Sequence, residues 1–153
     1  MRILEILTPK RIIGNLGERA ATKLLRKKGY RILERNYTAL GAEVDIIARK
    51  KDITVFIEVK TRNVKNLGYK EARPASAVNS EKQRKIIKAA GYYISHHPAD
   101  TRLRLDVIEV YTENDANDRV RIKEIKHIED AFDKNTAFDQ KYAYIRKKEG
   151  SNL

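Results

Sequence analysis

Residues 43–62 read EVDIIARKKDITVFIEVKTR and predict two strands joined by a charged turn. Successive side chains of a strand point to opposite faces, so Glu43 shares a face with Asp45, and Glu58 shares one with Lys60. An antiparallel hairpin sets Asp45 opposite Glu58, and the other acid of the first strand opposite Lys60. Two carboxylates that close repel each other, and a divalent cation relieves the repulsion. The stretch therefore predicts a central hairpin with a polar patch where a sheet interior would carry valine or isoleucine.

The composition indicates one globular domain with an excess of positive charge. The chain has 153 residues, of which 41% are hydrophobic and 35% charged, and its 33 basic and 21 acidic residues give a formal net charge of +12. A chain of this length can bury a hydrophobic core without disulfide bonds or a structural metal ion. The excess charge points to a polyanion, and nucleic acid is the usual candidate, although an acidic membrane surface or a merely well-solvated surface would carry it too.

The residue types exclude several other classes of protein. The chain has no cysteine, so neither a disulfide framework nor a thiolate zinc site can form. His96 and His97 diverge by about 100° on a helix, and His127 lies far along the chain, so we predict no zinc site and expect surface histidines. No apolar run has the length of a signal-peptide core or of a membrane span. We expect a cytoplasmic protein with no membrane partner.

Hydrophobic periodicity predicts a single α/β domain, a mixed sheet of about five strands with helices packed against it. The expected elements are helices over residues 13–28 and 80–96 and strands over residues 30–37, 43–49, 53–60, 102–111 and 119–128. Gly29 would stop the first helix, Asn79 or Ser80 would cap the second, and the charged last strand suits a sheet edge. Residues 61–78 are interpreted as a long loop that is functional or disordered. Residues 134–153 form a basic tail, helical or disordered, after a domain expected to span residues 1–133.

One face of the hairpin carries Ile47 and Phe56 beside its polar groups, which implies that another element covers it. The first predicted helix is the simplest cover, with Glu18 at the edge of its apolar stripe. A covered face with ionisable groups is costly unless it serves a function. Two plainer alternatives stay open: Glu18 as an ordinary rim glutamate near a helix N-terminus, and the polar groups of the hairpin as exposed cross-strand ion pairs.

The second predicted helix brings basic side chains toward the same patch. Lys82 lies one turn ahead of Ile86 on the apolar stripe, so its ammonium is aimed along the buried side unless it snorkels to solvent. Arg84 and Lys85 lie elsewhere around the helix, where a solvated face is the alternative. Together with Arg62 they are candidate phosphate contacts, which position a substrate without reading its sequence.

Two further residues have smaller predicted roles. Asp106 falls on the same face of its strand as Arg104 and Ile108, so we expect it to be partly buried as a structural ion pair or a backbone acceptor. Tyr69, in the predicted loop, is a candidate to stack on an unpaired base.

The hairpin also resembles a known motif. Asp45, followed after a dozen positions by Glu58-Val59-Lys60, resembles the PD-(D/E)xK nuclease superfamily. A more specific likeness, to the YraN-like uncharacterised, endonuclease-like bacterial family, covers about residues 14–133. It rests on Gly17-Glu18 with Ala21, Gly29-Tyr30, Arg35-Asn36, Gly41-Ala42-Glu43-Val44-Asp45, Val55-Phe56-Ile57-Glu58-Val59-Lys60-Thr61-Arg62, Val78 with Lys82-Gln83, Arg104-Leu105-Asp106-Val107 and Glu129-Asp130-Ala131-Phe132. Gly41-Ala42 stands where that family usually has paired glycines.

The resemblance implies an αβββαβ, restriction-endonuclease-like core similar to that of archaeal Holliday-junction resolvases. In that superfamily the residues matching Asp45 and Glu58 hold a metal ion, magnesium or manganese, and the residue matching Lys60 assists the attacking water. A helix glutamate matching Glu18 often joins them. The expected ligands are therefore Asp45, Glu58, Glu18 and the main-chain carbonyl of Val59. Glu43 is expected to contact these ligands without binding the ion itself.

The function expected from these residues and this resemblance is a magnesium-dependent endonuclease acting on branched or otherwise structured DNA. The expected partner is nucleic acid, DNA rather than RNA, and a homodimer stays open as an assembly. The main alternative is a nucleic-acid-binding protein that keeps the fold and the charge without cutting. A metal-free scaffold whose acidic face is structural is a third.

Overall fold

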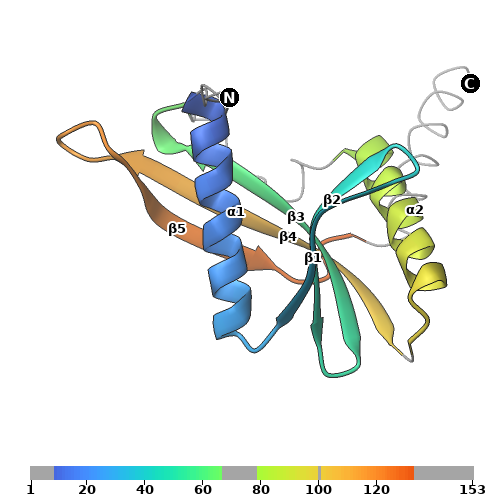
Figure 1. The fold of residues 1–153 in the computed structure, drawn as a ribbon. Coiled ribbons are helices and arrows are strands. Elements are labelled where there is room, and N and C mark those ends of the chain that lie inside the picture. Colours follow the sequence, from blue (N-terminus) through green and yellow to red (C-terminus); the bar gives the residue numbers. More distant parts are fainter. Residues whose placement is uncertain (1–8, 67–78, 100, 133–153) are drawn as a thin grey trace, which may run out of the picture.

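The computed structural model describes residues 9–66, 79–99 and 101–132, which form two α-helices and a five-stranded sheet (Figure 1). In chain order the elements are α1 (Pro9–Lys27), β1 (Arg31–Ala39), β2 (Ala42–Lys50), β3 (Ile53–Asn63), the short 3-10 helix η1 (Val64–Asn66), α2 (Ser80–His96), β4 (Arg102–Asn114) and β5 (Val120–Ile128). The predicted α/β class and the αβββαβ order are confirmed. The predicted tail and residues 67–78 of the predicted loop, including Tyr69, lie outside the described residues.

The sheet is mixed, and its strand order is β1-β2-β3-β4-β5. The β3–β4 pair is parallel, whereas the other three neighbouring pairs are antiparallel. Parallel neighbours need a connection that crosses one face of the sheet, and α2 lies in that connection. The charged β5 is an edge strand, as its composition predicts.

Each face of the sheet is covered by a different helix. Ile47 and Phe56 pack with Ile86 and other residues of α2, whereas Ile46 and Ile57 pack with α1. Figure 1 draws α1 in blue and α2 in yellow and green, apart from each other. The prediction that the first helix covers the face of Ile47 and Phe56 is therefore wrong. The crossover from β3 to β4 places α2 on that face and leaves the opposite face to α1.

Several element ends follow from local backbone chemistry. Within the described residues α1 already starts at Pro9, before its predicted start at residue 13. Gly29 ends it as predicted, with φ of +90°, a conformation that glycine adopts without strain. The side chain of Asn79 caps α2 by accepting a hydrogen bond from the Lys82 amide, at 2.9 Å. Strand β3 continues to Asn63, beyond its predicted end.

Gly17 sets the distance between α1 and the sheet. A Cβ atom at this position would lie 1.8 Å from Oγ1 of Thr61 on β3, whereas one at Gly14 would meet nothing within 4 Å. We expect Gly17→Ala to lower the free energy of unfolding by about 1–3 kcal/mol, because the helix must move away from the sheet. Gly14→Ala is the matched control and should be neutral or stabilising through its helix propensity. Urea unfolding checks both, and equal effects would contradict the close contact.

Candidate functional site

The two acidic residues of the predicted motif lie where β2 and β3 separate. The ladder between these strands runs from Lys50↔Ile53 to Ile46↔Ile57, which confirms the predicted register and ends just before Asp45 and Glu58. Beyond Ile46 the side chains of β2 no longer alternate between the two cores, because Val44 packs with Ile47 on the α2 face. The separation of the strands therefore opens the sheet at this pair of acids.

Asp45 bridges the gap between the two strands. Its Oδ2 accepts a hydrogen bond of 2.8 Å from the backbone N–H of Val59, in place of a strand-to-strand backbone bond. The N–H and C=O of one residue in a strand point to the same side. The Val59 carbonyl is therefore directed toward β2, the side on which the Asp45 carboxylate lies.

Glu58 is buried, and two ammonium groups hold it. Its side chain is only 4% exposed, and Oε1 accepts a short hydrogen bond from Nζ of Lys82. Nζ of Lys60 lies 3.4 Å from the same oxygen. A buried carboxylate requires such partners. The predicted aim of Lys82 along the buried side of α2 is confirmed, and the structure adds its partner.

The environment shifts the pKa values of this cluster. Burial, followed by the charge of Glu58, raises the pKa of Asp45 to about 7. Burial lowers the pKa of Lys60 below its ordinary value, although the charge of Glu58 opposes the shift. Burial also acts to lower the pKa of Lys82, but the hydrogen bond to Glu58 and its charge outweigh burial and raise it. The site thus holds one readily protonated acid beside a firmly paired one.

Glu18 lies beside the acidic pair of Asp45 and Glu58, and its own ion-pair partner is a different residue. Oε2 of Glu18 lies 3.5 Å from a guanidinium nitrogen of Arg35 on β1. Burial raises the pKa of Glu18 while Arg35 lowers it, and the charges of Glu43 and Glu58 contribute to the rise. Within residues 9–66, 79–99 and 101–132, no three histidine or acidic side chains are grouped to hold a metal ion. The sequence did not assign a partner to Glu18, because the pairing depends on how α1 crosses β1.

A pocket of about 380 Å³ opens onto the acidic pair. It lies between the turn after β1 and the first turns of α2, and its lining includes Glu43, Asp45, Glu58, Asn79, Lys82 and Lys85. Of the predicted phosphate contacts, Lys82 and Lys85 therefore line the pocket. Arg84 and Arg62 are half-buried on α2 and β3 and are not among its lining residues.

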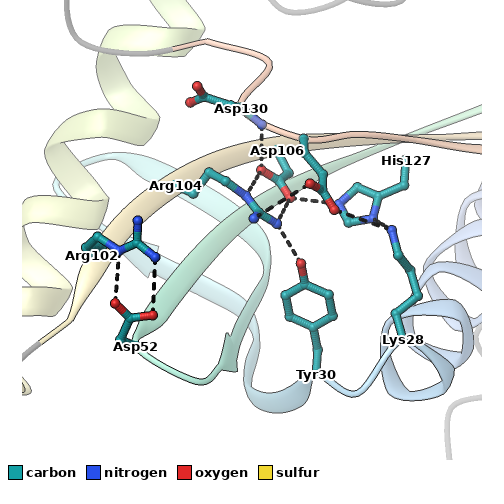
Figure 2. Close-up of polar contacts among 9 residues, drawn as sticks. Lys28, Tyr30, Asp52, Arg102, Arg104, Asp106, His127 and Asp130 are labelled. Atoms are coloured by element: carbon teal, nitrogen blue, oxygen red, sulfur yellow. Dashed lines mark hydrogen bonds and ion pairs between the residues drawn. The ribbon is translucent and has the colours of Figure 1, made fainter.

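A second polar cluster lies around Asp106 of β4, and Figure 2 shows its contacts. Asp106 is fully buried, and its carboxylate accepts two 2.9 Å hydrogen bonds from Arg104 and one of 2.9 Å from the backbone N–H of Asp130. Nε2 of His127 lies 2.7 Å from its Oδ2. The predicted structural role of Asp106, as an ion pair and a backbone acceptor, is confirmed.

This cluster joins segments that are distant in the sequence. Nζ of Lys28 lies 2.6 Å from Nδ1 of His127, and Arg104 donates a 2.6 Å hydrogen bond to the hydroxyl of Tyr30. The His127 side chain is only 4% exposed, so the prediction of a surface histidine is wrong here, although it holds for His96 and His97. An alternating, highly charged strand gave no sign that its histidine faces Asp106. The cluster ties the end of α1 to β4 and β5.

The fold and the site together define an α/β protein whose sheet separates at two carboxylates, one held by a backbone N–H and the other by two lysines. The chain belongs to the UPF0102 family, described as an uncharacterised protein family, whose model matches residues 17–110. This membership confirms the YraN-like resemblance. In the part of the chain that the structure describes, no helix is both long enough and apolar enough to span a membrane.

Similar proteins come from several bacteria and carry only the family name. The UPF0102 protein of Chlorobium phaeobacteroides is 42% identical over 121 residues, which cover 78% of this chain and 93% of that protein. That of Caldanaerobacter subterraneus is 40% identical over 124 residues, 80% of this chain and 96% of the relative. That of Acetivibrio thermocellus is 43% identical over 126 residues, 80% and 92% of the two chains.

Proposed function

We propose that this protein is a magnesium-dependent endonuclease that hydrolyses phosphodiester bonds of branched or structured DNA. The observation that carries the proposal is that Asp45 and the buried Glu58 line one pocket just beyond the end of the β2–β3 ladder, with Lys60 and Lys82 both on the Glu58 carboxylate. A buried acid with a strongly raised pKa, as Asp45 has, is more typical of a functional site than of a surface ion pair.

The donor atoms fit magnesium or manganese. Magnesium typically takes one or two protein carboxylates and fills its other positions with water and phosphate oxygens. Asp45 and Glu58 would supply the carboxylates and the Val59 carbonyl a further oxygen, and Glu18 would join only after leaving Arg35. When bound, the ion would stabilise the charge that develops in phosphodiester cleavage and lower the pKa of an attacking water.

The basic side chains would serve the substrate and the water. Lys60, held 3.4 Å from Glu58, would orient the attacking water or neutralise the scissile phosphate with its compact charge. Lys82 and Lys85 in the pocket, together with Arg84 on α2 and Arg62 on β3, would contact backbone phosphates. The net charge of +12 supports a polyanionic partner. A homodimer would allow both strands of a junction to be cut.

A cleavage assay tests the proposal on four-way junctions, flaps and single strands with magnesium or manganese. We expect the wild type to cut at least one of them, and Asp45→Asn and Lys60→Met each to lower the rate by about 100-fold or more. Asp52→Asn is the matched control, because this acid lies in the exposed turn of the same hairpin and pairs with Arg102. Cleavage that survives both site substitutions would place the chemistry elsewhere.

The alternative is a nucleic-acid-binding protein without catalysis. Two observations favour this alternative: no three acidic or histidine side chains are grouped among the described residues, and Glu58 is ion-paired with Lys60 and Lys82. It predicts that the wild type binds junction DNA but leaves it intact with either ion, and that Asp45→Asn binds equally well.

A further inference from the structure

We propose that Lys82 is a displaceable counter-ion: its ammonium holds the cation position at Glu58 until a divalent ion enters, and is then released into the pocket. The inference rests on the proposed function. It adds an order of events at the same site, because the lysine and the metal ion compete for one carboxylate.

The first support is the contact itself. Nζ of Lys82 donates a short hydrogen bond to Oε1 of Glu58, a side chain that is only 4% exposed. A divalent ion on the same buried carboxylate would lie beside this ammonium, and two cations so close in a buried site repel each other. Metal binding at Glu58 is therefore favoured when Lys82 moves away.

The second support is that Lys82 can leave at low cost. Lys60 lies 3.4 Å from the same oxygen, so Glu58 keeps one ammonium when Lys82 departs. The Lys82 side chain is 40% exposed and lines the pocket, so its flexible stem can turn toward solvent within the pocket. Its backbone stays in place, because its amide donates to the Asn79 cap.

The consequence is a link between the metal ion and the substrate. While Lys82 is paired with Glu58, the carboxylate compensates the charge of its ammonium, so Lys82 attracts a phosphate group only weakly. Released Lys82 joins Lys85 in a pocket that would then carry a metal ion and two ammonium groups. The ion pair lowers the apparent metal affinity, because only the fraction of molecules with an open pair can bind the ion.

Metal affinity tests this competition with Mn²⁺ as the probe, followed by its electron paramagnetic resonance signal. We expect Lys82→Met to bind Mn²⁺ about 10-fold more tightly than wild type, or more. Lys85→Met is the matched control: it removes the same charge from the same pocket, but Lys85 pairs with Glu81 at 3.8 Å. Its affinity should change by less than about 3-fold, because exposed charges are screened. Asp45→Asn should abolish binding and so locate the ion.

A second readout follows the lysine directly. Without metal, Lys82 should react more slowly than Lys85 with an amine-specific acetylating reagent, as measured by mass spectrometry, and Mn²⁺ should speed the reaction of Lys82 alone. Equal Mn²⁺ affinities for the two methionine variants, or labelling of Lys82 that ignores bound Mn²⁺, would overturn the inference and leave the metal site standing. Failure of the wild type and of Lys82→Met to bind Mn²⁺ would remove the metal site and the inference with it.

Discussion

Asp106→Ala is expected to lower the free energy of unfolding by about 3–5 kcal/mol, because removing one member of a buried charged cluster leaves its partners uncompensated. The substitution removes the shared acceptor of Arg104, His127 and the backbone N–H of Asp130. These donors are held in a region where water cannot easily replace the carboxylate, since Asp106 itself is fully buried. Urea unfolding of the variant and of the wild type gives the difference.

The matched control is the ion pair of Asp52 with Arg102, drawn in the same close-up (Figure 2). Nε of Arg102 lies 2.9 Å from Asp52, which resembles the Arg104 contact in geometry, but both side chains are exposed. Exposed pairs contribute little, so Asp52→Ala should leave the unfolding midpoint almost unchanged. Equal losses in the two variants would mean that burial is not what gives the Asp106 cluster its strength.

The acid limb of the stability profile provides an independent check on Asp106. Burial alone would raise its pKa, but the hydrogen bonds from His127 and Arg104 hold it below the ordinary value. A lowered carboxylate pKa stabilises the folded state above the unfolded pKa of about 4, and this stability is lost as the pH falls through the folded pKa. The difference between wild type and Asp106→Ala should therefore shrink in acid.

Asp45→Asn is expected to raise the stability of the metal-free protein at pH 8, by on the order of 2 kcal/mol. The pKa of Asp45 is raised to about 7 by burial and then by Glu58. Between pH 4 and pH 7 the folded state keeps a proton that the unfolded chain has lost, so stability falls as the pH rises through this window. Asparagine is neutral throughout and still offers an oxygen to the Val59 amide.

Unfolding with a chelator at pH 5 and pH 8 measures this effect. At pH 5 the advantage of the variant should be much smaller than at pH 8, because the wild type has then passed through only the first part of the window between the unfolded and the folded pKa of Asp45. A variant that is less stable at pH 8 would show that the Asp45 carboxylate stabilises the fold and would contradict this expectation. A metal-free scaffold also predicts that Asp45→Asn raises stability or leaves it unchanged.

Added magnesium distinguishes the proposed metal site from a metal-free scaffold. A ligand that binds only the folded state raises the free energy of unfolding. The gain grows with the logarithm of the ligand concentration once that concentration exceeds the dissociation constant. Magnesium should therefore raise the unfolding temperature of the wild type at pH 8 and leave that of Asp45→Asn unchanged. No shift in the wild type at millimolar magnesium would contradict the proposed metal site.

Features decided by short-range periodicity could be predicted from the sequence. The two-residue period of strands put Asp45 across from Glu58, and the ladder that ends at Ile46↔Ile57 agrees. Helical spacing aimed Lys82 along the buried side of α2, and the cap at Asn79 followed from its residue type. In each case the geometry depends on residues that are close in the chain, within one hairpin or within the turns of one helix.

Features decided by contacts between distant segments could not be predicted. Ile47 and Phe56 show that their face is covered, but the crossover between parallel strands decides that α2 is the cover and not α1. The partners of Lys82, Glu18 and His127 were equally hidden, because each lies on another element. The sequence thus determined the elements, the register and the candidate acids. Only the tertiary structure decided which cations pair with these acids. The direction of a side chain is set by its own strand or helix, whereas its partner depends on how elements far apart in the chain pack.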